Sequence, residues 1–332
     1  MSCAIEHLRV DRLASVPEAG PYAVGESPVW HAAQDALYWV DITGKRIVRH
    51  VIETGRRTHW AIPEQVGCIA FDGAGSVLAA MESGLFAVQL YEPPAGALEA
   101  HASLQALASP RFRCQGMRFN DGRCDRQGRF LAGTMVMDMS LGLAAGELLR
   151  HDAAARTLVP VVDGLIVQNG LAWSPDGRTM YLSDSHPSRR LIWTFDYDVD
   201  AGVPHSRRVF ADLNRYVGRP DGATVDEAGG YWICANDGAA LLRFAPDGRL
   251  DRQIALPAAK PAMCAFGGKR LDTLYVTTIR PAGASAGEYD GHVLALHVGI
   301  GGIPEPVLGD CLPRTLPGDP IAGSGTAPGL DP

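Results

Sequence analysis

Four oxygen-bearing side chains recur at equivalent positions of an internally repeated sequence. Six segments of the 332-residue chain share a turn followed by an alternating apolar run, and they begin at Trp30, Phe71, Cys124, Trp173, Val225 and Phe266. The residues four places before these starts are Glu26, Gly67, Asn120, Asn169, Asp221 and Ala262. Two carboxylates and two amides at one position of a repeat make a set of hard oxygen donors, which suits a divalent cation.

The same residues also have a purely structural interpretation. Asn and Asp before Gly form turns and cap the entries of strands, and both Asn169 and Asp221 precede a glycine. Turn chemistry alone does not require Glu26 at the same position, and strand interiors are poor in Asn and Asp. The shared position therefore favours a metal site. Because neither His nor Cys occurs at this position, a structural zinc site is disfavoured.

The spacing of the repeat indicates the elements that must position these residues. Successive starts differ by 41, 53, 49, 52 and 41 residues, which leaves room for about four short strands per unit. We therefore predict an all-β fold, a six-bladed β-propeller with four-stranded antiparallel blades around a central channel. A pair of β-sandwiches is the alternative, and the near-constant period disfavours it. In a propeller the first strand of each blade lines the channel, so the repeated position would form a ring at one mouth.

The predicted propeller spans residues 1–312 as a single domain. Either RVDRLAS near the N-terminus or HVLALHV near the C-terminus would provide the strand that closes the ring. Residues 313–332 form a tail rich in Gly and Pro, which we expect to be flexible.

Composition argues against several classes of protein. A net charge of -7 and a pI of about 5.8 disfavour nonspecific binding to nucleic acid or anionic lipid. No apolar run reaches the length of about 18 residues that a membrane span needs, and charged residues interrupt the N-terminal segment where a signal peptide would be apolar. Seven cysteines without a CxxC pair indicate reduced thiols. We therefore expect a cytoplasmic monomer or weak homodimer that binds neither nucleic acid nor membranes.

Four motifs of this chain resemble those of the SMP-30/gluconolactonase family, which includes regucalcin. They are GESPVW from Gly25, RFNDGRCDRQGRFLAGTM from Arg118, NGLAWSPDG from Asn169 and RPDGATVDEAGGYW from Arg219. The resemblance extends from Gly25 to Val307. It implies a six-bladed propeller with one divalent cation (Ca, Zn, Mn, Mg or Fe(II)) at the channel mouth. It also implies a hydrolase of carboxylic esters, one that converts a sugar lactone such as glucono-, galactono-, arabino- or xylonolactone to the aldonic acid.

The resemblance further implies roles for individual residues. Those that match the metal ligands of the family are Glu26, Asn169 and Asp221. Those that match its substrate contacts are Arg118 and Asn120. Asp138 is a further candidate for substrate binding, because family members often place a residue that touches the sugar shortly after AGTM. His186 is another, since it lies in a loop after a second strand, which should return to the face of the ring.

These roles imply a mechanism in which the cation polarises the lactone carbonyl and Asp221 activates the attacking water. Arg118 and Asn120 would hold the carbonyl oxygen and the sugar hydroxyls. Two alternatives remain open. One is another metal-dependent esterase or phosphotriesterase on the same propeller, and the other is a calcium-binding regulator without catalytic activity.

Overall fold

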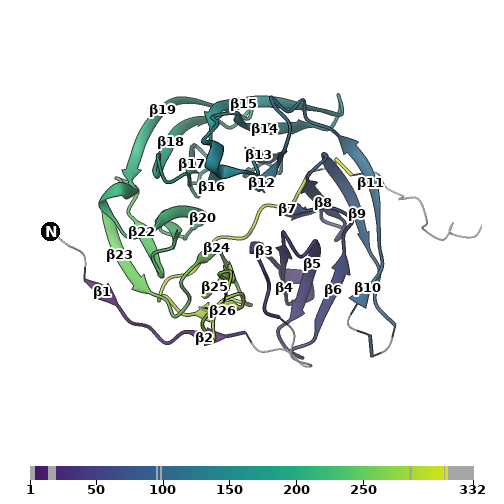
Figure 1. Cartoon of the computed structure of the whole chain (residues 1–332), viewed down its shortest axis with the longest axis horizontal. Helices are drawn as coiled ribbons and strands as arrows, with labels where there is room; N and C mark the ends of the chain where they lie inside the picture. Colours follow the sequence, from purple (N-terminus) through teal and green to yellow (C-terminus); the bar gives the residue numbers. More distant parts are fainter. Residues whose placement is uncertain are drawn as a thin grey trace, which may run out of the picture.

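The computed structural model describes residues 4–13, 20–94, 96–97, 99–283, 286–309 and 311–312. These residues form six sheets arranged in a ring around a central channel (Figure 1), and they include no α-helix. The predicted six-bladed propeller is confirmed, and the alternative of two sandwiches is wrong. The tail for which flexibility was expected, residues 313–332, lies outside the described residues.

Each blade has four antiparallel strands, numbered from the channel outward. Blade 1 has β3 (Gly25–His31), β4 (Ala36–Asp41), β5 (Arg46–Val51) and β6 (Arg57–Ala61), and blade 2 has β7 (Val66–Phe71), β8 (Val77–Met81), β9 (Leu85–Leu90) and β11 (Ala102–Ala108). Blade 3 has β12 (Met117–Cys124), β13 (Phe130–Val136), β14 (Gly146–Asp152) and β15 (Thr157–Leu165), and blade 4 has β16 (Gln168–Trp173), β17 (Thr179–Asp184), β18 (Leu191–Asp198) and β19 (Val203–Asp212). Blade 5 has β20 (Arg219–Val225), β21 (Tyr231–Asn236), β22 (Ala240–Phe244) and β23 (Leu250–Ala255).

Blade 6 combines strands from the two ends of the chain. Its first three strands are β24 (Pro261–Gly267), β25 (Thr273–Thr278) and β26 (Val293–Leu296), and the fourth is the N-terminal β2 (Asp11–Arg12), antiparallel to β26. Both segments proposed for closure of the ring therefore meet in this blade. Two short strands extend other blades in parallel, β1 (Ile5–Glu6) along β23 and β10 (Glu99–Ala100) along β6, and these were not predicted.

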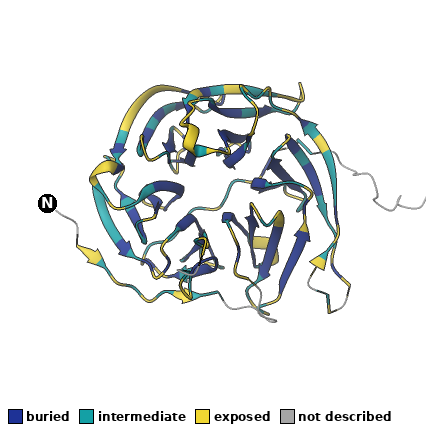
Figure 2. Cartoon of the chain, viewed as in Figure 1, coloured by how far each residue is buried: buried dark blue, intermediate teal, exposed yellow. Residues whose placement is uncertain are grey.

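The core lies between the faces of neighbouring blades. The inner strands are buried on both faces, whereas the exposed strand residues are concentrated in the outer strands (Figure 2). Trp30, Trp173 and Trp232, which begin or follow strands in the repeat, are all buried in these interfaces. Large apolar side chains at these positions stabilise the stacking of blades because each removes a large apolar area from water.

The C-terminal segment crosses the end of the channel opposite the predicted ring. Gly302 forms a bridge with Asp226 of the blade 5 turn, and Leu308 forms a bridge with Asp72 of the blade 2 turn. Between them, Glu305 pairs with Arg123 Nε of β12 at 2.9 Å. In Figure 1 this yellow segment runs across the ring of blades.

The described residues also bear on membrane-spanning helices and on the cysteines. Within the part of the chain that the structure describes, no helix is long and apolar enough to cross a membrane. The described cysteines are all free thiols, namely Cys68, Cys114, Cys124, Cys234, Cys264 and Cys311.

Two buried histidines of blade 1 predict a loss of stability in mild acid. Burial lowers the pKa of His50 and of His59 to about 4, below the value near 6.5 of an unfolded chain. Between these values the unfolded state binds more protons, so the free energy of unfolding falls as the pH drops from about 6.5 to 4, by about 2 kcal/mol per histidine. Urea unfolding across this range measures the slope. His50→Gln should flatten it and His101→Gln, at an exposed position, should not; an unchanged slope in His50→Gln would contradict this origin.

Candidate functional site

Every inner strand carries a β-bulge at the repeated position. The pairing of first and second strands shifts register at or around Glu26, Gly67, Asn120, Asn169, Asp221 and Ala262, in blades 1 to 6 respectively. A bulge places an extra residue in one strand and changes the direction of its side chain. The register shift therefore falls at the same position of the repeat in all six blades.

The motif Asn169-Gly170 shows why a glycine follows the ring residue. Gly170 has φ +62°, and a Cβ atom there would lie 2.5 Å from the Tyr231 hydroxyl and 2.6 Å from Ser183 Oγ. The left-handed conformation disfavours any side chain, and the space for one is also missing. Ser27, which follows Glu26 in blade 1, also adopts a positive φ, of 48°.

The structure brings the predicted ring residues Glu26, Asn120, Asn169 and Asp221 together, and all four are buried. Asn120 Nδ2 donates to Asn169 Oδ1 at 3.2 Å and to the Gln168 carbonyl at 2.7 Å. Arg118 Nη1 donates to Asn120 Oδ1 at 2.9 Å. The amide of Asn120 therefore connects the guanidinium of blade 3 to the ring residue of blade 4.

The two carboxylates of the ring are electrostatically unfavourable in isolation. Burial raises the pKa of Glu26 well above its usual value, and the negative charges of Asp221 and Asp121 raise it further. Burial also raises the pKa of Asp221, although the positive charge of Arg219 opposes this rise. Within the described residues, the only hydrogen bond of Glu26 is from its neighbouring Ser27 N at 3.2 Å. A bound cation would favour the ionised form of both groups, so the residues present fit one.

The orientation of Asn169 also fits an oxygen ligand. Its Nδ2 donates to Ser185 Oγ at 2.6 Å, and Ser185 Oγ in turn donates to the Pro220 carbonyl. The amide nitrogen is thereby held in the protein, and Oδ1 remains on the side of the ring. Among the described residues, no group of three or more His, Cys, Asp or Glu side chains is placed to hold a metal. A cation here therefore depends on the amide oxygen of Asn169 beside the two carboxylates.

Asn236, at the end of β21, was not predicted from the sequence. Asn236 is fully buried, and its Nδ2 donates to Asp221 Oδ2 at 2.6 Å while Arg219 Nη2 donates to its Oδ1 at 3.1 Å. Oδ2 of Asp221 is thus hydrogen-bonded to Asn236, and Oδ1 is the oxygen that could contact a cation in the ring. The signal in the sequence was an asparagine that ends the apolar run YWICA.

We expect Asn236→Leu to weaken the binding of a divalent cation by about tenfold to a hundredfold, because the carboxylate of Asp221 loses the partner that orients it. Asn236→Asp is expected to weaken binding as well, since it places a second carboxylate against Asp221. Calorimetric titration with Ca²⁺, Mn²⁺ or Zn²⁺ measures this effect without reference to turnover. Asn214→Leu, at an exposed position, is the control. Wild-type affinity in both Asn236 variants would show that Asp221 needs no orienting partner.

Asp138 and His186 lie beside each other in the loops that follow β13 and β17. Asp138 Oδ1 accepts from Ser140 N at 3.1 Å and from Ser140 Oγ at 2.6 Å, which caps a short 3-10 turn, Met139–Leu141. His186 Nε2 lies 3.1 Å from the Met139 carbonyl. His186 therefore contacts the turn that Asp138 caps. Among the described residues, neither side chain forms a hydrogen bond with Glu26, Asn120, Asn169 or Asp221.

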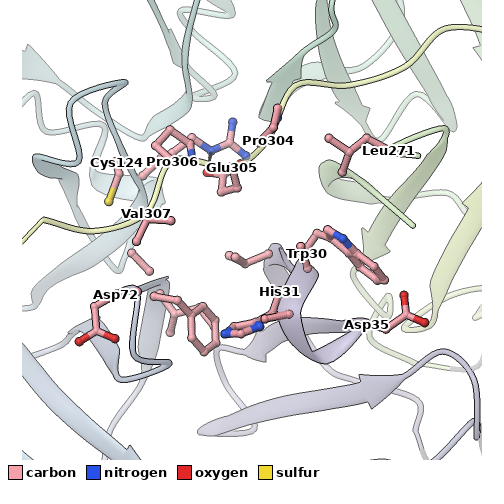
Figure 3. Close-up of a pocket in the computed structure, with 18 of the residues that line it drawn as sticks. Trp30, His31, Asp35, Asp72, Cys124, Leu271, Pro304, Glu305, Pro306 and Val307 are labelled. Atoms are coloured by element: carbon pink, nitrogen blue, oxygen red, sulfur yellow. Dashed lines mark ion pairs between the residues drawn. The ribbon is translucent and has the colours of Figure 1, made fainter. Parts of the chain in front are cut away.

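A cavity lies at the far end of the channel. It has a volume of about 590 Å³, and residues from blades 1, 2, 3 and 6 line it beneath the segment Pro304–Val307. Figure 3 shows Trp30, His31 and Val307 around this space. Trp30 and His31 end β3, and Glu26 is its second residue, so the cavity and the ring are at opposite ends of this strand. None of the predicted site residues lines this cavity.

Known proteins resemble this chain over most of its length. The family model described as "SMP-30/Gluconolactonase/LRE-like region" matches residues 24–280. A 6-deoxy-6-sulfogluconolactonase from Pseudomonas putida is 37% identical over 294 residues, which cover 87% of this chain and 96% of that protein. A pentonolactonase from Haloferax volcanii is 32% identical over 290 residues, 85% of this chain and 93% of that protein. Among solved structures, a calcium-binding regucalcin from Agrobacterium tumefaciens has a TM-score of 0.81 at 23% identity, over 92% of this chain and 99% of that chain; this likeness shows the fold alone.

Proposed function

Because the chain belongs to the SMP-30/gluconolactonase/LRE-like family, we propose that it hydrolyses a sugar lactone to the aldonic acid with a divalent cation at the channel mouth. The observation that carries the proposal is the buried cluster of Glu26, Asn169 and Asp221. These three residues bring two carboxylates and one amide together, and none of them carries a positive charge. The names of the two relatives above, both lactonases, support the same reaction.

We propose that Glu26, Asn169 and Asp221 hold the cation, which when bound would polarise the lactone carbonyl. Asp221 accepts the proton of the attacking water, and the hydrogen bond from Asn236 to Oδ2 keeps its carboxylate in a fixed orientation for this step. A bound cation would keep this carboxylate ionised, which is the form that can accept a proton.

Arg118 is the stronger of the two proposed substrate contacts on β12. Its Nη1 donates to Asn120 Oδ1 and to the Phe119 carbonyl at 2.7 Å, whereas its Nε and Nη2 have no hydrogen-bond partner within the described residues. These donors are available for a carbonyl oxygen that gains negative charge during attack. Asn120 uses its amide hydrogens on Gln168 and Asn169, so its part in substrate binding is to hold Arg118 and Asn169. Contacts from Asp138 and His186 would require a substrate that reaches the outer loops.

A substrate panel tests the proposed reaction. Glucono-, galactono-, arabino- and xylonolactone are compared with aryl esters and phosphotriesters, each with Ca²⁺, Zn²⁺, Mn²⁺, Mg²⁺ or Fe(II). Turnover that is confined to the lactones and lost on chelation supports the proposal. Preference for an aryl ester or phosphotriester would assign the alternative esterase, and binding of calcium without turnover of any substrate would assign the regulator. The native cation, a monomer or weak homodimer and a cytoplasmic location remain predictions.

A further inference from the structure

Two cations share one carboxylate beside the candidate site. Arg219 Nε donates to Asp237 Oδ2 at 2.8 Å, and Lys260 Nζ pairs with Asp237 Oδ1. The side chains of Arg219 and Lys260 are 18% and 29% exposed. Arg219 begins β20, Asp237 follows β21 and Lys260 precedes β24, so the cluster lies at the same end of the channel as the ring. Two positive charges against one negative charge leave an excess of positive charge in this cluster.

The cluster is connected to the ring by hydrogen bonds. Arg219 Nη2 donates to Asn236 Oδ1 at 3.1 Å, and Asn236 Nδ2 donates to Asp221 Oδ2 at 2.6 Å. Two hydrogen bonds and one amide group place the guanidinium within about 8 Å of the Asp221 carboxylate. The third nitrogen, Nη1, has no hydrogen-bond partner in the described part of the chain. For Lys260, the partner that the structure provides is Asp237, and an ammonium group has three protons to donate.

A lactone at the ring would reach this cluster with its exocyclic end. In a six-membered sugar lactone, three to four bonds of about 1.5 Å separate the carbonyl from the exocyclic carbon, a span of roughly 4–6 Å. A substituent on that carbon therefore extends to the distance at which Arg219 lies. A guanidinium and an ammonium group side by side suit a tetrahedral oxyanion. The planar guanidinium and the flexible ammonium group can donate hydrogen bonds to different oxygens of the anion.

We propose that Arg219 and Lys260 form a subsite for an anionic substituent of the lactone, such as a sulfonate or a phosphate. This inference rests on the proposed lactonase function and names the class of lactone that the site takes. A neutral sugar offers only hydroxyl groups at this position. An anionic substituent would gain charge-assisted hydrogen bonds there, and these are stronger than neutral ones.

The experiment compares lactones that differ only in the exocyclic group. The cation-loaded enzyme is assayed with glucono-1,5-lactone and with its 6-phospho and 6-deoxy-6-sulfo counterparts, in the wild type, in Lys260→Met and in Lys269→Met. Lys269 is an exposed lysine at the far end of the channel and serves as the matched control. We expect kcat/KM of the wild type to be at least tenfold higher for one of the anionic lactones. In Lys260→Met that value should fall by about tenfold, mainly through KM, whereas the neutral lactone changes less than twofold.

The outcomes separate the two proposals. A preference for the phosphorylated or for the sulfonated lactone supports the subsite and identifies its anion. Equal kcat/KM for neutral and anionic lactones, or an equal loss for both in Lys260→Met, overturns the subsite and leaves lactonase activity in place. If no lactone is hydrolysed, the proposed function fails, and calorimetry with gluconate and 6-phosphogluconate then decides on the subsite alone. Tighter binding of 6-phosphogluconate that Lys260→Met abolishes would support it, and equal binding would overturn it.

Discussion

Asp221→Ala is expected to lower the kcat of lactone hydrolysis by about a thousandfold or more, because the change removes both a cation ligand and the proposed proton acceptor. Asp221 is buried, and Asn236 would be left without the acceptor for its amide. Steady-state kinetics with the best lactone of the panel measure the loss, and metal analysis of the purified variant measures the bound cation. Asp247→Ala, at an exposed turn of blade 5, should leave both unchanged.

Asp221→Asn separates the two roles of this residue. The variant keeps an oxygen that can ligate a cation but no longer a carboxylate that can accept a proton. We expect it to retain part of the cation and to lose nearly as much turnover as Asp221→Ala. If Asp221→Asn keeps the cation and turns over at close to the wild-type rate, the residue is a ligand only and another group activates water.

Gly170→Ala is expected to lower the free energy of unfolding by about 2–4 kcal/mol, since a left-handed residue acquires a side chain where no space exists. The added Cβ atom would meet Tyr231 and Ser183 at the distances given above. Urea denaturation measures the change. Because the strain falls next to Asn169, we also expect weaker binding of the cation.

Gly164→Ala is the matched control for this prediction. Gly164 has a similar φ of +71°, but no atom lies within 4 Å of the Cβ position. Its substitution should cause only the backbone cost, about 1 kcal/mol. Equal destabilisation by the two substitutions would show that crowding at Gly170 has no effect.

The sequence predicted those features that repeat. A residue at a fixed distance from a recurring turn occupies the same level in every blade, which is why Glu26, Asn120, Asn169 and Asp221 could be assigned to one ring without any structure. Asn169 and the turn Pro175–Gly177 lie on either side of the repeat start at Trp173. That turn ends the strand at the face opposite the ring, because β16 runs from one end of the channel to the other.

Features that do not repeat could not be predicted from the repeated pattern. Ser185 and Asn236 each follow or end a second strand, and they act through hydrogen bonds to one ring residue only. The bulges arise from the pairing of two strands, which the order of residues in one strand does not reveal. The resemblance indicated Asp138, and the position after a second strand indicated His186. The direction of a side chain in a loop, however, depends on neighbours such as Ser140 and Met139.

The closure of blade 6 has a consequence for the order in which the protein can be completed. Asp11 pairs with Ala295, and Ile5 pairs with Gln253, so β1 and β2 wait for partners that are translated much later. Until then, the growing chain has unpaired strand edges at both ends, and such edges pair readily with other chains. Translation speed over the last blade and the availability of chaperones should therefore influence the yield of folded protein more than changes in the central blades do.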